Sequence, residues 1–168
     1  MKTGNEQNHD HTNKHNKDYK KLFVMALLSF LAMYTLMYAM VNTFSNVISN
    51  INQFYMAGLM TMPMIIIELV LKSSMYKNKK LNAALMVISS IGLLTFFILI
   101  RQQCAVSDKQ FLKSMIPHHS AAILMCEESA VQDPEIKELC RKIILNQQSE
   151  IDQMKSKLRE LNTSLVEL

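Results

Sequence analysis

After a polar tail of residues 1–21, the chain consists of long apolar runs separated by short polar segments, and it becomes largely polar only after residue 100. The runs cover residues 22–41, 54–71 and 81–100, and only the middle one contains a charge. Each is long enough to cross a hydrocarbon core of roughly 30 Å as a helix rising about 1.5 Å per residue. The first run also exceeds the apolar core of a cleaved signal peptide. Residues 22–100 are therefore predicted to form a three-span membrane domain.

The polar sequence after the third run has the spacing of amphipathic helices. Ser107, with Gln110 three residues later, is typical of a capping box that opens a helix. Pro117 removes a backbone donor within that helix, so we expect a kink there. This segment is the first arm of a predicted extracytoplasmic domain spanning residues 101–168.

A short turn and a second helix follow. Asp133 is placed to cap the second helix, and Pro134 suits its first position. Apolar residues then recur at helical spacing to about Leu161. The segment is thus expected to be a two-helix hairpin, and the whole chain to be all-α, with three transmembrane helices before the hairpin.

Lysine positions predict how the chain crosses the membrane. Five lysines lie within residues 2–21 and four within residues 72–80, whereas residues 42–53 contain none. Cytoplasmic loops retain positive charge, so the N-terminus is predicted to be cytoplasmic and the hairpin extracytoplasmic. In a bacterium this means a multi-pass protein of the inner membrane with a periplasmic or extracellular C-terminal domain. The net charge of +4 comes from these clusters and indicates no nucleic-acid binding.

The polar N-terminal tail, residues 1–21, lacks apolar periodicity and is expected to be disordered and cytoplasmic. It contains His9, His11 and His15, which either bind a metal loosely or are simply solvated. At the cytoplasmic end of the second span, Glu68 lies four residues before Lys72. We expect these two residues to form an ion pair.

Methionines gather on one face of each of the first two spans. Thioethers suit Cu(I), but methionine also fills irregular contacts between helices, so both interpretations stay open. A channel or carrier lined by these faces would need several copies of the chain. The residues are Met33, Met37 and Met40 in the first span, and Met56, Met60 and Met64 in the second.

Folding the hairpin about Asp133 brings two cysteines opposite each other. Cys126 and Cys140 are equidistant from the turn. In an oxidising space they are candidates for a disulfide, and otherwise for metal thiolates. Cys104 is left over, and it either bridges two subunits or remains free.

The same folding places His119 opposite Gln147, with Met115 one turn from the histidine on its own helix. A buried amide needs a hydrogen-bond partner. Gln147 or Glu150 is therefore expected either to orient an imidazole that binds a metal or to satisfy an ordinary core histidine. His118 points about 100° away from His119 and faces another helix or a partner subunit.

These residues carry a resemblance to a known family. The phrase Met115-Ile116-Pro117-His118-His119, followed by Gln147-x2-Glu150-Ile151-x2-Met154, resembles the bacterial domain-of-unknown-function 305 family over roughly residues 105–160. The resemblance implies a ferritin-like helical bundle exported from the cytoplasm, and some members are linked to copper binding and copper tolerance. The positions carried over are Met115, His118, His119, Gln147, Glu150 and Met154.

Together these features predict a membrane-anchored extracytoplasmic protein that binds copper, as Cu(I), in copper tolerance or handling. The candidate metal ligands are Met115, His118, His119, Met125 and Met154. A single hairpin is half of a four-helix bundle, so a homodimer or higher homo-oligomer is expected, with a copper transporter or chaperone as a further partner. The alternative is a non-catalytic structural or interaction module that assembles membrane subunits. Catalysis is not expected, because the segment has no Glu-x-x-His pair of a di-iron site.

Overall fold

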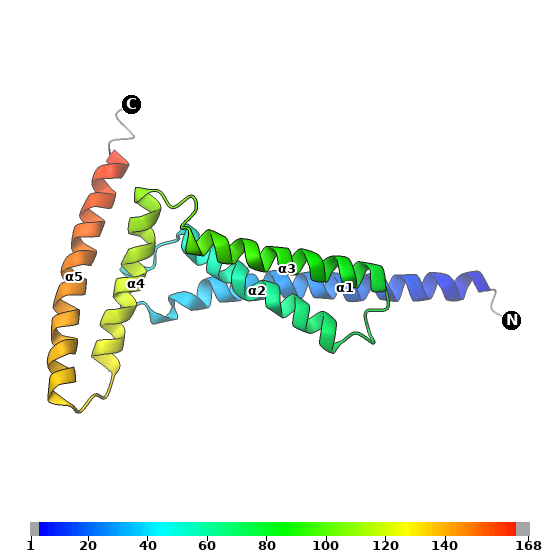
Figure 1. Ribbon diagram of the computed structural model, residues 1–168, viewed down its shortest axis with the longest axis horizontal. Helices are drawn as coiled ribbons and strands as arrows, with labels where there is room; N and C mark the ends of the chain where they lie inside the picture. Colours follow the sequence, from blue (N-terminus) through cyan, green and yellow to red (C-terminus); the bar gives the residue numbers. More distant parts are fainter. Residues whose placement is uncertain (1–3, 164–168) are drawn as a thin grey trace. The chain divides into compact units, whose positions relative to one another are not determined.

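The computed structural model describes residues 4–163 of the 168-residue chain, with side chains described from residue 17 onward. The described chain is all-helical, as predicted, and contains no strand (Figure 1). Two short 3-10 helices follow the first long helix. In chain order the elements are α1 (Gly4–Leu36), η1 (Met37–Met40), η2 (Phe44–Asn46), α2 (Ile51–Leu71), α3 (Lys79–Arg101), α4 (Asp108–Glu128) and α5 (Pro134–Thr163).

Three helical segments are long and apolar enough to cross a membrane, which agrees with the three predicted runs. They are Lys17–Met40, Ile51–Leu71 and Lys79–Arg101. α1 begins at Gly4, so helical backbone extends through the tail that was expected to be disordered. Extending an existing helix adds one hydrogen bond per ordered residue and avoids the cost of nucleation. The side chains of His9, His11 and His15 lie outside the described residues.

The chain divides into two compact units. One contains α1 up to Tyr34 together with Tyr55–Gln102, and the other contains Thr35–Phe54 together with the chain from Gln103 onward. The first unit therefore holds most of the apolar helices. The second combines the loop between α1 and α2 with α4 and α5.

In the first unit, α2 and α3 approach each other through a small residue. A Cβ added to Gly58 would lie 2.5 Å from the ring of Phe96. The ring of Tyr55 lies beside the same ring at a tilt of 47°, with centroids 6.5 Å apart. Glycine thus allows an aromatic ring of one helix to pack against the backbone of the other, as is common between apolar helices.

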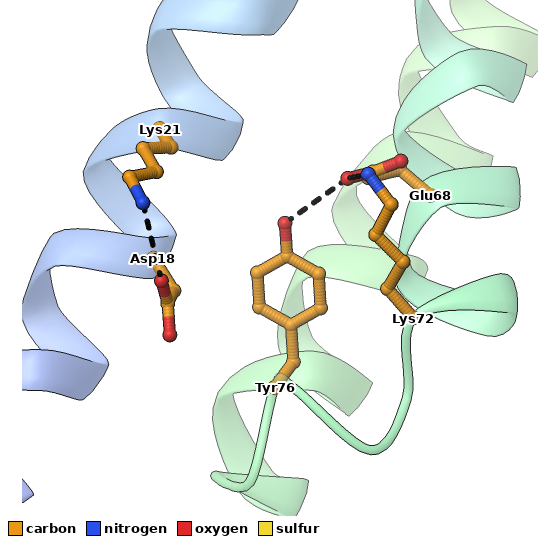
Figure 2. Close-up of polar contacts among 5 residues, drawn as sticks. All are labelled: Asp18, Lys21, Glu68, Lys72 and Tyr76. Atoms are coloured by element: carbon orange, nitrogen blue, oxygen red, sulfur yellow. Dashed lines mark hydrogen bonds and ion pairs between the residues drawn. The ribbon is translucent and has the colours of Figure 1, made fainter.

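Polar contacts close the other end of this unit, where α2 leads into α3 (Figure 2). The ammonium of Lys72 lies 2.7 Å from Oε1 of Glu68, which confirms the predicted pair. The hydroxyl of Tyr76 donates to the same oxygen at 3.4 Å, and Tyr76 is buried against Leu22 and Leu69. Burial and the nearby Glu68 raise the pKa of Tyr76. The charge of Glu68 is therefore compensated by Lys72, and its contacts with Lys72 and Tyr76 explain its presence at the end of α2.

Candidate functional site

The second unit is built around three isoleucines that pack α4 against α5, which lie side by side (Figure 1). Ile116, Ile123 and Ile151 are at most 1% exposed, and Ile48 from the loop before α2 packs against them. Burying such a side chain stabilises the fold by about 1.5–3 kcal/mol. This core fixes which faces of the two helices meet.

The starts of the two helices are held differently. Oδ1 of Asp133 accepts hydrogen bonds from the backbone N–H groups of Glu135 and Ile136, at 2.8 and 3.1 Å, which confirms the predicted cap of α5. Ser107 occupies the N-cap of α4, but its side chain makes no capping bond. Oε1 of Gln110 instead accepts from the N–H of Ile51 at 3.0 Å. The predicted capping box is wrong, because a distant backbone donor competes for the amide.

Pro117 is buried inside α4, which continues as one helix from Asp108 to Glu128. Helical backbone thus continues through Pro117, and the expected kink at this proline stays a prediction. The two histidines that follow Pro117 stay on the same continuous helix.

His119 joins the two arms of the hairpin. Its Nε2 lies 2.7 Å from Oε2 of Glu150 on α5, and its Nδ1 lies 2.9 Å from the backbone oxygen of Met115. Both partners are hydrogen-bond acceptors when the carboxylate is ionised. The contacts thus need two protons, either both on the ring or one on the ring and one on the carboxyl group. His119 is only 8% exposed, so this arrangement is a buried clamp between α4 and α5.

The partner of His119 is Glu150 and not Gln147, the residue placed directly opposite it by counting from the turn. Side chains in a helix lean toward its N-terminus. In this antiparallel hairpin the side chains of α4 therefore lean away from the turn, and those of α5 lean toward it. The imidazole of His119 consequently meets a residue about one turn further along α5 than the one directly opposite. Gln147 is partly buried on the same helix.

The remaining predicted ligands are spread over different environments. His118 is exposed, and its ring centroid lies 6.0 Å from that of His119. Met125 is 52% exposed and lies seven residues from His118, on the same face of α4. Met115 is partly buried, whereas Met154 packs against the isoleucine core. One chain therefore does not gather these five side chains around a point.

A polar contact between the loop joining α1 to α2 and helix α4 was not found from the sequence. The N–H of Asn42 donates to Oγ of Ser120 at 2.9 Å, and the Ser120 hydroxyl donates to Oδ1 of Asn42. Asn46, 2% exposed, donates from Nδ2 to Oδ1 of Asn42 at 3.0 Å. The sequence feature that could have indicated this contact is the presence of four asparagines within residues 42–52. Such a cluster in a loop without charges is typical of backbone and side-chain hydrogen bonding.

The two cysteines of the hairpin face each other, as the folding about the turn predicted. Cys126 and Cys140 are free thiols that line the same cavity. Burial, followed by the contact with Cys140, raises the pKa of Cys126 to about 11. The disulfide itself stays a prediction. Cys104 lies apart, partly buried in the turn after α3.

The methionine faces of the apolar helices do not form a buried row. Met56 and Met60 of α2 are 38% and 42% exposed, and Met40 is 48% exposed. Met33, Met37 and Met64 are partly buried. The exposed members face away from the packed interior of the chain, and a role for these methionine faces in metal binding stays a prediction.

Two comparisons with known proteins match this chain. The family described as "Domain of unknown function (DUF305)" matches residues 98–158, which include α4 and most of α5. A protein of Acanthamoeba polyphaga mimivirus, described as "Uncharacterized protein L153", is 38% identical over 112 residues, which cover 66% of this chain and 72% of that protein. That similarity is longer than the family match and so includes more than the hairpin. No solved structure matches the chain.

Proposed function

The chain belongs to the DUF305 family, and we propose that it is a membrane-anchored, non-catalytic protein whose α4–α5 hairpin binds a soft metal ion, Cu(I), outside the cytoplasm. One observation carries this proposal: two adjacent histidines have different environments. The ring nitrogens of His119 both make hydrogen bonds within the chain itself, whereas His118 is exposed. The first histidine therefore stabilises the hairpin, and the second is accessible to a ligand.

The donors near His118 fit a soft ion. Met115 precedes it by one helical turn and Met125 follows it by two. Thioether and imidazole groups suit Cu(I), while the hard cations Mg²⁺ and Ca²⁺ prefer oxygen ligands. When bound, the ion would be held by the side chains of His118 and Met115, which can share one site at this spacing. Met125 lies about 10 Å along the axis from His118 and would serve a neighbouring position.

A second copy of the hairpin would complete such a site. Apolar side chains remain exposed on both arms, including Phe111 at 51% and Leu145 at 66%. Two hairpins that bury these faces against each other would form a four-helix bundle, the ferritin-like arrangement expected for the exported domain. The proposed unit is therefore a homodimer or a higher homo-oligomer, with ligands contributed across its interface.

The proposed topology places the N-terminus in the cytoplasm and the hairpin on the opposite side of the membrane. It is supported by the three apolar helices, by the lysines of the tail and of residues 72–80, and by the lack of lysines in residues 42–53. In a bacterium the protein would lie in the inner membrane with a periplasmic or extracellular hairpin. The uneven distribution of lysines between the loops predicts the sidedness of the chain and does not by itself identify the membrane. A hairpin in this position could pass copper to a transporter or chaperone.

Copper binding by the purified full-length protein in detergent tests this function. Reduced protein would compete with a chromophoric chelator for Cu(I), and His118→Ala is expected to weaken binding by about tenfold or more, because even supporting residues of metal sites cost 10–100-fold. Met154→Leu is the matched control, since it replaces a donor that packs in the core. Equal affinities of the two variants, or no bound copper in the parent protein, would refute the proposal.

The clamp between His119 and Glu150 favours one alternative, a module that only assembles membrane subunits. In that case Cu(I) would change neither the oligomeric state nor the thermal stability of the protein. Size-exclusion chromatography with light scattering, with and without Cu(I), distinguishes the two functions. Copper-dependent association supports the metal-binding function, and metal-independent association of a protein without copper affinity supports the module.

A further inference from the structure

A cavity of about 360 Å³ lies at the turn of the hairpin and contains the facing cysteines. Cys126, from the last turns of α4, and Cys140, from the second turn of α5, both line it. Lys137 and Arg141 line the same cavity, along with the apolar side chains of Ile144 and Leu145. Two sulfur donors, two cations and an apolar wall are thus gathered at one place, separate from His118 and Met115.

The thiols are close enough to act together. They line one cavity from the two facing helices, and the proximity of Cys140 contributes to the raised pKa of Cys126. The isoleucine core and the Asp133 cap hold the helices in this register. Paired sulfur donors of this kind select soft ions, because thiolate ligands favour Cu(I) over harder cations.

The surroundings favour a monovalent ion with two ligands. Zinc sites in proteins are almost always four-coordinate. Within the described side chains, no group of three or more His, Cys, Asp or Glu residues lies close enough to hold a metal. The two cysteines therefore lack the further protein ligands that zinc needs, whereas a linear arrangement between two sulfurs satisfies Cu(I).

The charge of the cavity fits the same ion. A Cu(I) ion bound by two thiolates carries a net charge of −1. Arg141 pairs with Glu138, while Lys137 makes no ion pair among the residues whose side chains are described. The ammonium of Lys137 is therefore available to compensate the anionic complex.

We propose that Cys126 and Cys140, when reduced, form a second metal site that binds one Cu(I) ion as a bis-thiolate. Two sulfur–copper bonds form, both S–H bonds are lost, and the two protons pass to solvent, so no oxidant or reductant is consumed. A disulfide between the same sulfurs would remove both donors. The site rests on its own residues and not on the proposed Met/His site.

The test uses the reduced, full-length protein in detergent under anaerobic conditions, with Cu(I) as the probe. Binding should produce the ultraviolet charge-transfer band of a copper thiolate, and X-ray absorption should show two sulfur neighbours. Cys126→Ser and Cys140→Ser should each abolish the band and remove one equivalent of bound copper. Cys104→Ser, outside the cavity, is the matched control and should leave both unchanged. Lys137→Glu should weaken the site by about tenfold.

The outcomes separate this site from the proposed function. If Cys126→Ser and Cys140→Ser lose the charge-transfer band and His118→Ala keeps it, the bis-thiolate site is supported. This holds whether or not the Met/His site binds copper. An unchanged copper stoichiometry in Cys126→Ser would overturn it, as would a Cys126–Cys140 disulfide that persists in the reducing agent. If the serine variants lose helical circular dichroism, wild-type protein alkylated at both cysteines replaces them, and unchanged copper binding after alkylation overturns the site.

Discussion

Oε2 of Glu150 on α5 lies 2.7 Å from Nε2 of His119 on α4, and the opposite nitrogen of the same ring lies 2.9 Å from the backbone oxygen of Met115. The imidazole thereby connects the two arms of the hairpin to each other and to the preceding turn of its own helix. A residue that the family resemblance suggested as a ligand is thus held by protein acceptors on both sides. Copper would have to replace one of these contacts to bind there.

Glu150→Ala should destabilise the hairpin more than Gln147→Ala. The first change leaves a buried ring nitrogen of His119 without its partner, and the cost should be about 1 kcal/mol, less than is usual for a charged hydrogen bond because Glu150 is 53% exposed. Gln147, partly buried, is the matched residue one turn away. Chemical unfolding of the two variants, followed by circular dichroism, gives the comparison. A larger loss in Gln147→Ala would show that the amide is the true partner.

Ser120→Ala should loosen the loop between α1 and α2. The hydroxyl is fully buried and bonds with Asn42 from the loop, so its removal leaves buried polar groups unpaired, at a cost of about 1–3 kcal/mol. Hydrogen exchange of residues 41–48 should become faster, with α5 little affected. Ser129→Ala, at an exposed serine just after α4, controls for the loss of a hydroxyl. Equal exchange in the two variants would contradict a docking role for Ser120.

The stability of the hairpin should fall at alkaline pH through Cys126. Its pKa is raised from 9.0 to about 11, so the folded state favours the protonated thiol. This contribution is fully present below pH 9 and is lost as pH rises toward 11. Unfolding at a series of pH values, compared with Cys126→Ser, measures it. The serine variant should show a smaller loss of stability over this range, and an identical loss would exclude the thiol as the cause.

The two loops of the membrane domain should be accessible from opposite sides. Phe44 is 96% exposed in the loop before α2, and Ser73 is exposed just after α2. In a background without native cysteines, Phe44→Cys should react with an impermeant maleimide added outside sealed cells. Ser73→Cys should react only after the membrane is opened. Labelling of both positions, or of Ser73→Cys alone, in sealed cells would invalidate the proposed topology.

The apolar segments and the cap of α5 were predictable because they depend on local sequence. A run of 20 apolar residues has the length to span a bilayer whatever surrounds it, and Asp133 reaches backbone donors only two and three residues away. That Cys126 and Cys140 face each other was also predictable, because both lie close to the tight turn. Over so short a distance, little error accumulates in the register between the two helices.

The partners of His119, Gln110 and Ser120 were decided by the tertiary structure. Glu150 lies 31 residues from His119, and Asn42 lies 78 residues from Ser120. Such pairs depend on how side chains lean within packed helices and on how a loop from one part of the chain returns to a helix from another. The sequence by itself thus determined the apolar spans, the two helices of the hairpin and the chemistry of the candidate ligands. Which of those ligands are engaged within the fold and which stay exposed was decided by packing, because a hydrogen bond depends on positions in space that no local pattern specifies.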